Sequence, residues 1–147
     1  MDHRVERLRT PAECAIFARN AVAKKRPDLA LEAHRKAVNL QVATHEAVSP
    51  LEAEGLSTVY ALDALLTHQN AGKKKRATAT WQAVKRYGVI EAIQKAVNRR
   101  SATENSAALR EIGLEDLAFE AFVLRHEASF GEATVKISKE RLASVTA

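Results

Sequence analysis

The segment SPLEAEGLSTVYALDALLTHQN (residues 49–70) decides the fold, because it carries a complete signal for a long helix. It begins with a capping serine, a proline at the first helical position and Glu52 three residues after the cap, the residue types that favour a helix start. Large apolar residues then recur at helical spacing: Leu56, Val59, Tyr60, Leu62, Leu65 and Leu66. Because this apolar face is broad, we predict that the helix lies at the centre of the core and ends at residues 70–72.

Two helices are predicted before this central one. Thr10, Pro11 and Glu13 repeat the same start signal, and Pro27 requires the first helix to end at about Lys24. The second helix is expected from Pro27 to about residue 47. The predicted inward residues of the first helix are Cys14, Phe17, Ala18, Ala21 and Val22, and those of the second are Leu29, Ala30, Ala33, Ala37 and Leu40.

The segment ALEAHRKAVNL (residues 30–40) resembles the second helix of a tetratricopeptide repeat. Ala30, His34 and Ala37 match its small, aromatic and small positions, and Ala18 matches the small position of the preceding helix. The resemblance covers about residues 12–42, although Cys14 and Ala21 stand where the repeat has large aromatics, and no second copy follows. It implies a tightly packed antiparallel hairpin over residues 10–47 rather than a peptide-binding solenoid, which needs several repeats.

Shorter helices are predicted after residue 72. They run from Thr78 or Thr80 to Tyr87, from Val89 to Asn98, from a capping box at residues 101–104 to Ile112, over residues 113–128, and from a capping box at residues 129–132 to about Ser144. No segment alternates in the period of two that strands require. We therefore predict an all-α, single compact domain over residues 1–147, with about seven to eight helices and residues 1–9 as a flexible N-terminal tail.

Positive charge is concentrated in GKKKRATATWQAVKRYGVIEAIQKAVNRR (residues 72–100), here called the basic segment. The whole chain has a formal net charge of +5, whereas residues 64–103 contain nine Lys or Arg against one acid, a net +8. Cations directly before a helix start, together with the first N–H groups of that helix, favour an anion. The predicted nucleic-acid-binding residues are Lys73, Lys74, Lys75, Arg76, Thr78, Thr80, Lys85, Arg86, Lys95, Arg99 and Arg100.

Two further questions about the basic segment stay open in the sequence. Its helix–Gly–helix pattern is compatible with a helix-turn-helix, in which residues 89–100 would offer Glu91, Gln94, Lys95, Asn98 and Arg99 to base edges. The aromatic residues Trp81 and Tyr87 either stack on bases, if they are exposed, or form an inward face with Val84.

No other group predicts a reaction or a metal centre. His34 and His45 share a helix face but lie eleven residues apart, about 16 Å along a helix. The single cysteine, Cys14, is expected to be a buried thiol in a reducing compartment. We expect the acidic residues Glu111, Glu115, Asp116 and Glu120 to form a solvated face. The predictions are therefore no catalytic residue, no metal and no cofactor.

The favoured function is a non-catalytic protein that binds the phosphate backbone of DNA or RNA. One alternative is a helical adaptor that binds a protein partner, and another is a helical domain or subunit of a larger enzyme. The chain has no apolar run of transmembrane length and no secretory signal at its start, so we expect a cytoplasmic protein without membrane contact. The sequence leaves the oligomeric state open.

Overall fold

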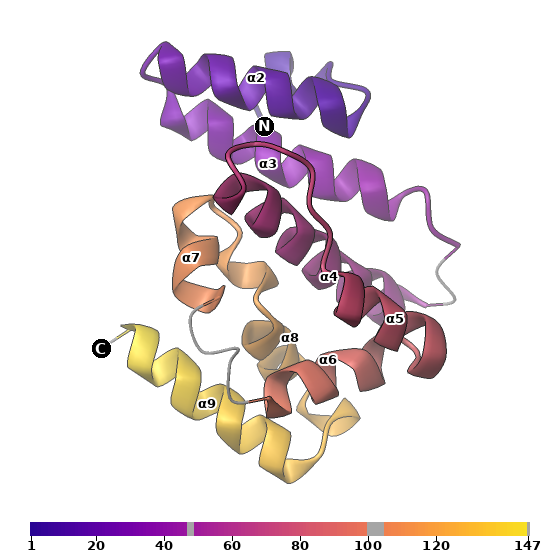
Figure 1. Ribbon diagram of the computed structural model, residues 1–147. Coiled ribbons are helices and arrows are strands. Elements are labelled where there is room, and N and C mark those ends of the chain that lie inside the picture. The colour runs from indigo at the N-terminus through magenta and orange to yellow at the C-terminus, as the bar shows by residue number, and fades with distance from the viewer. Residues whose placement is uncertain (47–48, 100–104, 147) are drawn as a thin grey trace.

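The computed structural model describes residues 1–46, 49–99 and 105–146, and within them every regular element is helical (Figure 1). This confirms the all-α prediction. The α-helices are α1 (His3–Glu6), α2 (Pro11–Ala23), α3 (Pro27–Val42), α4 (Pro50–Gln69), α5 (Thr78–Tyr87), α6 (Val89–Asn98), α7 (Asn105–Glu111), α8 (Phe119–Arg125) and α9 (Glu132–Thr146), with the short 3-10 helices η2 (Glu115–Leu117) and η3 (Glu127–Ser129).

Helix α4 is the central element, as its broad apolar face predicts. Tyr60, Ala61 and Leu65 pack with buried residues of α3 and of the segment that contains α7 and η2. Leu56 and Val59 pack with buried residues of α6 and α8. Gly55 brings α4 close to α6, because a Cβ at that position would lie 3.1 Å from a methyl group of Val89. The glycine inside this helix therefore serves close packing.

The helix starts that combine a capping hydroxyl with a proline are confirmed. The Thr10 hydroxyl accepts a hydrogen bond from the Glu13 amide, and the Ser49 hydroxyl accepts one from the Glu52 amide, both at 3.1 Å. Each side chain thereby satisfies an N–H group that has no partner inside its helix. The capping box predicted at residues 101–104 lies outside the described residues.

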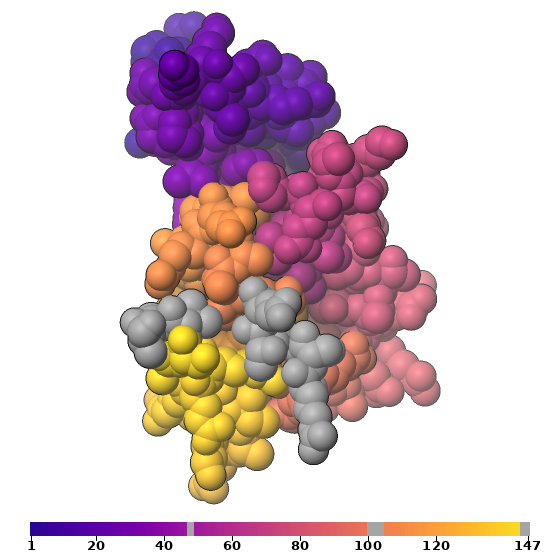
Figure 2. Space-filling view, turned by 60° about the vertical axis from the view of Figure 1, so that its left-hand side comes forward, coloured from indigo at the N-terminus to yellow at the C-terminus, as the bar shows by residue number. Residues whose placement is uncertain are grey.

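Helices α2 and α3 pack against each other at one end of the molecule, while the C-terminal helix lies at the other end (Figure 2). Small residues let these two helices approach closely; the buried ones are Ala18, Ala21, Ala30 and Ala33. Cys14 of α2 is also buried, as predicted. Val22, predicted to face inward, is instead 62% exposed. Residues 1–9, predicted to be a tail, contain α1, whose Val5 is fully buried.

The end of the second predicted helix is wrong. Helix α3 stops at Val42 rather than near residue 47. After it, the chain turns so that the His45 ring contacts Tyr60 and Trp81, with ring centroids 5.2 and 5.7 Å apart. Contacts with distant residues therefore decide where this helix ends.

The single helix predicted over residues 113–128 is also wrong. The backbone is extended at Ala118, with φ −65° and ψ 147°, and this separates η2 from α8. Leu117, Ala118, Phe119 and Glu120 are four consecutive buried residues. Leu117 and Ala118 pack into the cluster that α4 forms with α3 and α7, whereas Phe119 packs into the cluster of α4, α6 and α8, so the bend directs neighbouring residues into different parts of the interior.

The last helix begins later than its predicted cap. Helix α9 starts at Glu132, and the Gly131 carbonyl accepts the hydrogen bond from Val135, whereas Ser129 belongs to η3.

In the part of the chain that the structure describes, no helix has the length and apolar character needed to cross a bilayer.

Candidate nucleic-acid interface

The loop that carries the lysines of the basic segment is fixed to helix α4. The Thr67 hydroxyl accepts a hydrogen bond from the Lys75 amide at 3.0 Å and donates one to the Lys75 carbonyl at 3.2 Å. The Asn70 side-chain amide donates to the Lys73 carbonyl at 3.2 Å. The chain thus doubles back beside α4 before it enters α5 (Figure 1). Because these bonds use only the backbone of the loop, the side chains of Lys73, Lys74 and Lys75 remain exposed.

The carboxylate of Asp63 holds the start of α5. It accepts a hydrogen bond from the Ala77 amide at 2.7 Å and another from the indole nitrogen of Trp81 at 2.8 Å. The Arg76 guanidinium lies 3.7 Å from the same carboxylate and 4.9 Å from the centroid of the Trp81 ring. The amide that precedes α5 is therefore already bonded to an anion of this chain, and Arg76 is directed toward that anion.

Sequence reasoning missed Asp63, although the sequence contains a signal for it. The residue lies three positions after Tyr60 and four after Val59, on the apolar face of a helix predicted to be central. A buried carboxylate needs hydrogen-bond or charge partners. An acid on such a face therefore indicates a polar contact with another part of the chain.

The two aromatic residues of the basic segment have different environments. Trp81 is partly buried, and its ring centroid lies 4.8 Å from that of Tyr60. Tyr87, in contrast, is 48% exposed at the end of α5. The inward face predicted from Trp81, Val84 and Tyr87 is therefore correct for the first two residues and wrong for Tyr87, since Val84 packs against the buried cluster of α4, α6 and α8.

Two cations lie against the exposed Tyr87 ring. The Arg86 guanidinium carbon is 5.4 Å from the ring centroid, and the Lys95 ammonium nitrogen is 4.6 Å from it. Lys95 is brought there because Gly88 turns the chain between α5 and α6 with a backbone φ of +89° and ψ of 163°. Lys95 also lies 3.9 Å from Glu91, one helical turn earlier.

The polar side of α6 is partly engaged by the C-terminal part of the chain. The Gln94 side-chain oxygen accepts a hydrogen bond from the Gly131 amide at 2.9 Å. The Asn98 side-chain oxygen accepts one from the Thr134 hydroxyl at the same distance. Two of the residues considered for base reading in a helix-turn-helix are therefore bonded to the start of α9.

The remaining predicted binding residues are distributed along the segment. Lys85 and Arg86 are exposed in the last turn of α5, Thr78 is exposed at its start, and Thr80 is half-buried. Arg99 is exposed, and its carbonyl accepts a hydrogen bond from the Arg141 side chain. Arg100 lies outside the described residues. The structure thus brings Arg86, Tyr87 and Lys95 together and directs Arg76 toward Asp63.

The predicted solvated acidic face is wrong for Glu120, which is 2% exposed. Its carboxylate accepts a hydrogen bond from Ser106 at 3.0 Å and forms an ion pair with Arg141 at 3.3 Å. Asp116 is exposed but bound to Arg35 of α3, which holds the pKa of the aspartate below its usual value. These acids therefore join distant helices.

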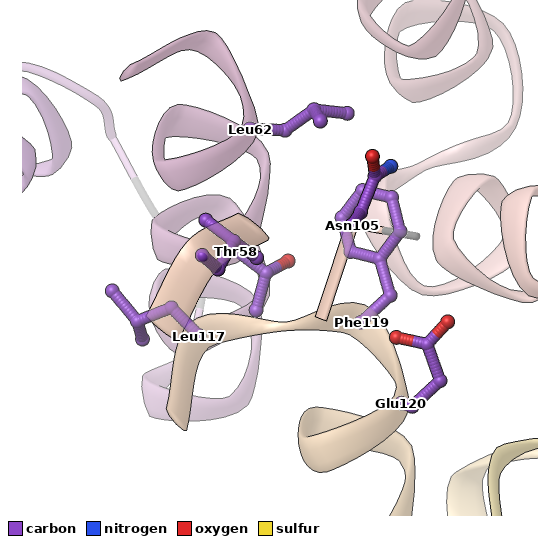
Figure 3. A pocket seen from close by; sticks show the side chains of 7 residues that line it. Thr58, Leu62, Asn105, Leu117, Phe119 and Glu120 are labelled. Atoms are coloured by element: carbon purple, nitrogen blue, oxygen red, sulfur yellow. The ribbon is translucent and has the colours of Figure 1, made fainter. Parts of the chain in front are cut away.

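A cavity of about 10 Å³ lies beside Glu120, lined also by Thr58, Leu62, Asn105, Leu109, Leu117 and Phe119 (Figure 3). This volume is sufficient for about one water molecule. An organic ligand does not fit there.

The histidines make contacts within the fold. His126 binds Glu54 of α4, and the Tyr60 hydroxyl bonds with His45. The rings of His34 and His68 meet edge to face with their centroids 6.2 Å apart. Burial lowers the pKa of His34, and the neighbouring His68 lowers it further. Among the described residues, no three or more His, Cys, Asp or Glu side chains form a group able to hold a metal ion.

Comparison of the chain with protein-family models, with curated proteins and with solved structures found no match.

Proposed function

We propose that this protein binds nucleic acid through the phosphate backbone, using the basic segment. The observation that carries the proposal is a set of exposed cations that have no carboxylate within ion-pair distance in the described part of the chain. Its members are Lys73, Lys74, Lys75, Lys85, Arg86 and Arg99. Cations without a carboxylate partner are available to phosphates.

The fixed loop backbone supports this function. Thr67 and Asn70 hold the backbone of residues 73 and 75, so binding does not have to order that backbone, which lowers its entropic cost. Neutralising phosphates releases condensed counterions, and binding of this kind weakens steeply as salt increases. Phosphate contacts fix position without reading sequence, so the expected binding is of low sequence specificity.

The test measures the affinity of labelled single-stranded and duplex oligonucleotides by fluorescence anisotropy at increasing salt. We expect binding at low salt that falls strongly toward physiological salt, and loss of binding in the triple variant Lys73→Glu, Lys74→Glu, Lys75→Glu. The matched control reverses Arg19, Lys24 and Lys136, which are exposed and outside the basic segment. It has the same change in net charge.

Three results would refute the proposal. The first is that the wild-type protein does not bind at low salt. The second is that the control variant loses binding as strongly as the loop variant, and the third is that the loop variant binds like wild type. Melting temperatures of the three proteins should agree, since every substituted side chain is exposed. If the protein is a helical adaptor, its partner would bind equally well to the loop variant.

A further inference from the structure

An exposed aromatic residue in the basic segment has no role in the core. Tyr87 is 48% exposed, and the other large apolar side chains found exposed in the described residues, Met1, Ile16 and Val22, all belong to the N-terminal part of the chain. Trp81 is engaged in contacts within the fold, because its indole nitrogen donates a hydrogen bond to Asp63 and its ring packs beside Tyr60 and His45. Tyr87 is therefore the aromatic ring of this segment that is available to a ligand.

The surroundings of Tyr87 combine a ring with positive charge. Arg86 and Lys95 lie within 5.4 and 4.6 Å of its centroid, inside the range of about 6 Å over which cations interact with aromatic rings. Lys85 is exposed on the same helical turn. A nucleotide offers the matching groups, a flat base for the ring and a phosphate on either side for the cations.

The residue after Tyr87 is a glycine and adds no side chain beside the ring. Apart from its two chain neighbours, which include Tyr87 itself, no atom lies within 4 Å of a Cβ built on Gly88. The turn itself is held on both sides, since the Gly88 amide donates to the Val84 carbonyl and the Gly88 carbonyl accepts from the Ala92 amide. The ring is thus attached to a defined turn, and Arg86 and Lys95 lie over it.

The same hairpin is poorly arranged for reading a duplex. Gln94 and Asn98 of α6 are bonded to Gly131 and Thr134, which removes them from the row of side chains that a recognition helix would place in a major groove. A base inside a duplex is already stacked on its neighbours, whereas an unpaired base has a free face for an aromatic ring.

We propose that Tyr87 is a stacking platform for an unpaired base, so that the ligand is single-stranded nucleic acid, with Arg86, Lys95 and Lys85 contacting the phosphates beside that base. This inference rests on the proposed function and adds to it the class of nucleic acid and the residue that selects it. The loop lysines supply affinity for either class, and Tyr87 supplies the preference for single strands.

The first experiment compares the affinity of Tyr87→Ala, Tyr87→Phe and wild type for an oligothymidylate single strand and for a duplex of the same length. We expect Tyr87→Ala to weaken single-strand binding by about 5- to 150-fold, the usual effect of removing one stacked aromatic ring, and to leave duplex binding unchanged. Tyr87→Phe retains the ring and should bind like wild type. Ile16→Ala removes another exposed apolar side chain and is the control.

The second experiment uses a single strand containing 5-iodouracil, which crosslinks to a stacked aromatic residue on illumination. We expect the adduct on Tyr87. The inference is overturned if Tyr87→Ala binds single strands like wild type, or if the adduct lies elsewhere, while charge reversal at residues 73–75 still abolishes binding; the proposed function then stands alone. If wild type binds neither ligand at low salt, both are refuted.

Discussion

At the scale of single residues, Asp63 is a polar connection inside an otherwise apolar interface. It joins α4 to the start of α5 through the Ala77 amide and the Trp81 indole. Asp63→Ala leaves two donors without this acceptor, and each unsatisfied buried donor costs about 1–3 kcal/mol. We expect a decrease of about 3 kcal/mol in the free energy of unfolding, measured by urea denaturation. Glu111→Ala, an exposed acid, should stay within about 0.5 kcal/mol of wild type; equal losses would contradict this role of Asp63.

His34 should make stability depend on pH in a defined window. Burial between α3 and α4, together with His68, lowers its pKa from the ordinary value of 6.5, so the unfolded chain binds a proton more readily than the folded one. Its contribution is therefore fully present above pH 6.5 and is lost as the pH falls from 6.5 through the lower pKa of the folded state. The carboxyls of Glu54 and Asp116 act at more acidic pH, because their pKa values are lowered below 4.5 and 3.8.

The check is urea denaturation of wild type and His34→Gln between pH 7.5 and 5. Wild type should lose stability over this range, and the variant should show a flatter profile. His3→Gln, which alters an exposed histidine, should behave like wild type. A His34→Gln profile as steep as that of wild type would show that another group is responsible.

At the scale of elements, Gly88 sets the angle between α5 and α6. Its φ of +89° and ψ of 163° belong to a region that is essentially restricted to glycine, with a cost of about 1–3 kcal/mol for other residues. We expect Gly88→Ala to destabilise the protein by that amount although its Cβ would meet no neighbour. Asparagine tolerates left-handed helical backbone but not this ψ, so Gly88→Asn should cost as much. Recovery of stability by asparagine in thermal unfolding would contradict this explanation.

The ion pair between Glu120 and Arg141 attaches α9 to α8. Its two side chains are 3% and 9% exposed, and removal of one partner from a buried pair typically costs about 3–5 kcal/mol. We expect Arg141→Met to lower the free energy of unfolding by this amount and the double variant with Glu120→Gln to recover part of it. Arg35→Met breaks a more exposed pair with Asp116 and should cost about 1 kcal/mol. Equal costs at both sites would show that burial of the pair is unimportant.

At the scale of the whole molecule, the proposed binding predicts a salt dependence that can be counted. On single strands the slope of log affinity against log salt is about −0.7 for each neutralised phosphate. Single substitutions Lys74→Gln and Lys85→Gln should each reduce the magnitude of the slope by about 0.7, and together by about 1.4. Tyr87→Phe should leave the slope unchanged. If the slope stays the same in both lysine variants, these side chains do not contact phosphates.

Local signals explain which parts of the fold could be predicted from the sequence. The starts at Thr10 and Ser49, and the glycine turn at residue 88, depend on a few neighbouring residues, and the observed helices begin there. The break at Ala118 and the end of α3 at Val42 depend on tertiary contacts instead. The residues of one segment predict a helix, but they do not identify the distant residues whose contacts end the helix or bend the chain.

The same distinction applies to the candidate site, where some features could be predicted from the sequence and others could not. The concentration of positive charge over residues 72–100 is visible in the sequence, because charge is a property of composition. The environments of Trp81 and Tyr87 are not, since they depend on which distant parts of the chain lie opposite each ring. Asp63 lies opposite Trp81, and Tyr87 lies beyond the packed part of α5.

The rate at which the buried thiol of Cys14 is modified can report how often helix α2 separates from the rest of the fold. Cys14 is 1% exposed, and burial raises its pKa, so a thiol reagent can modify it only after α2 separates from its neighbours. The rate of modification in native buffer therefore reports how often this helix opens, while the rate in mild denaturant reports when opening becomes global. As the only cysteine of the chain, it gives this measurement without any engineered label.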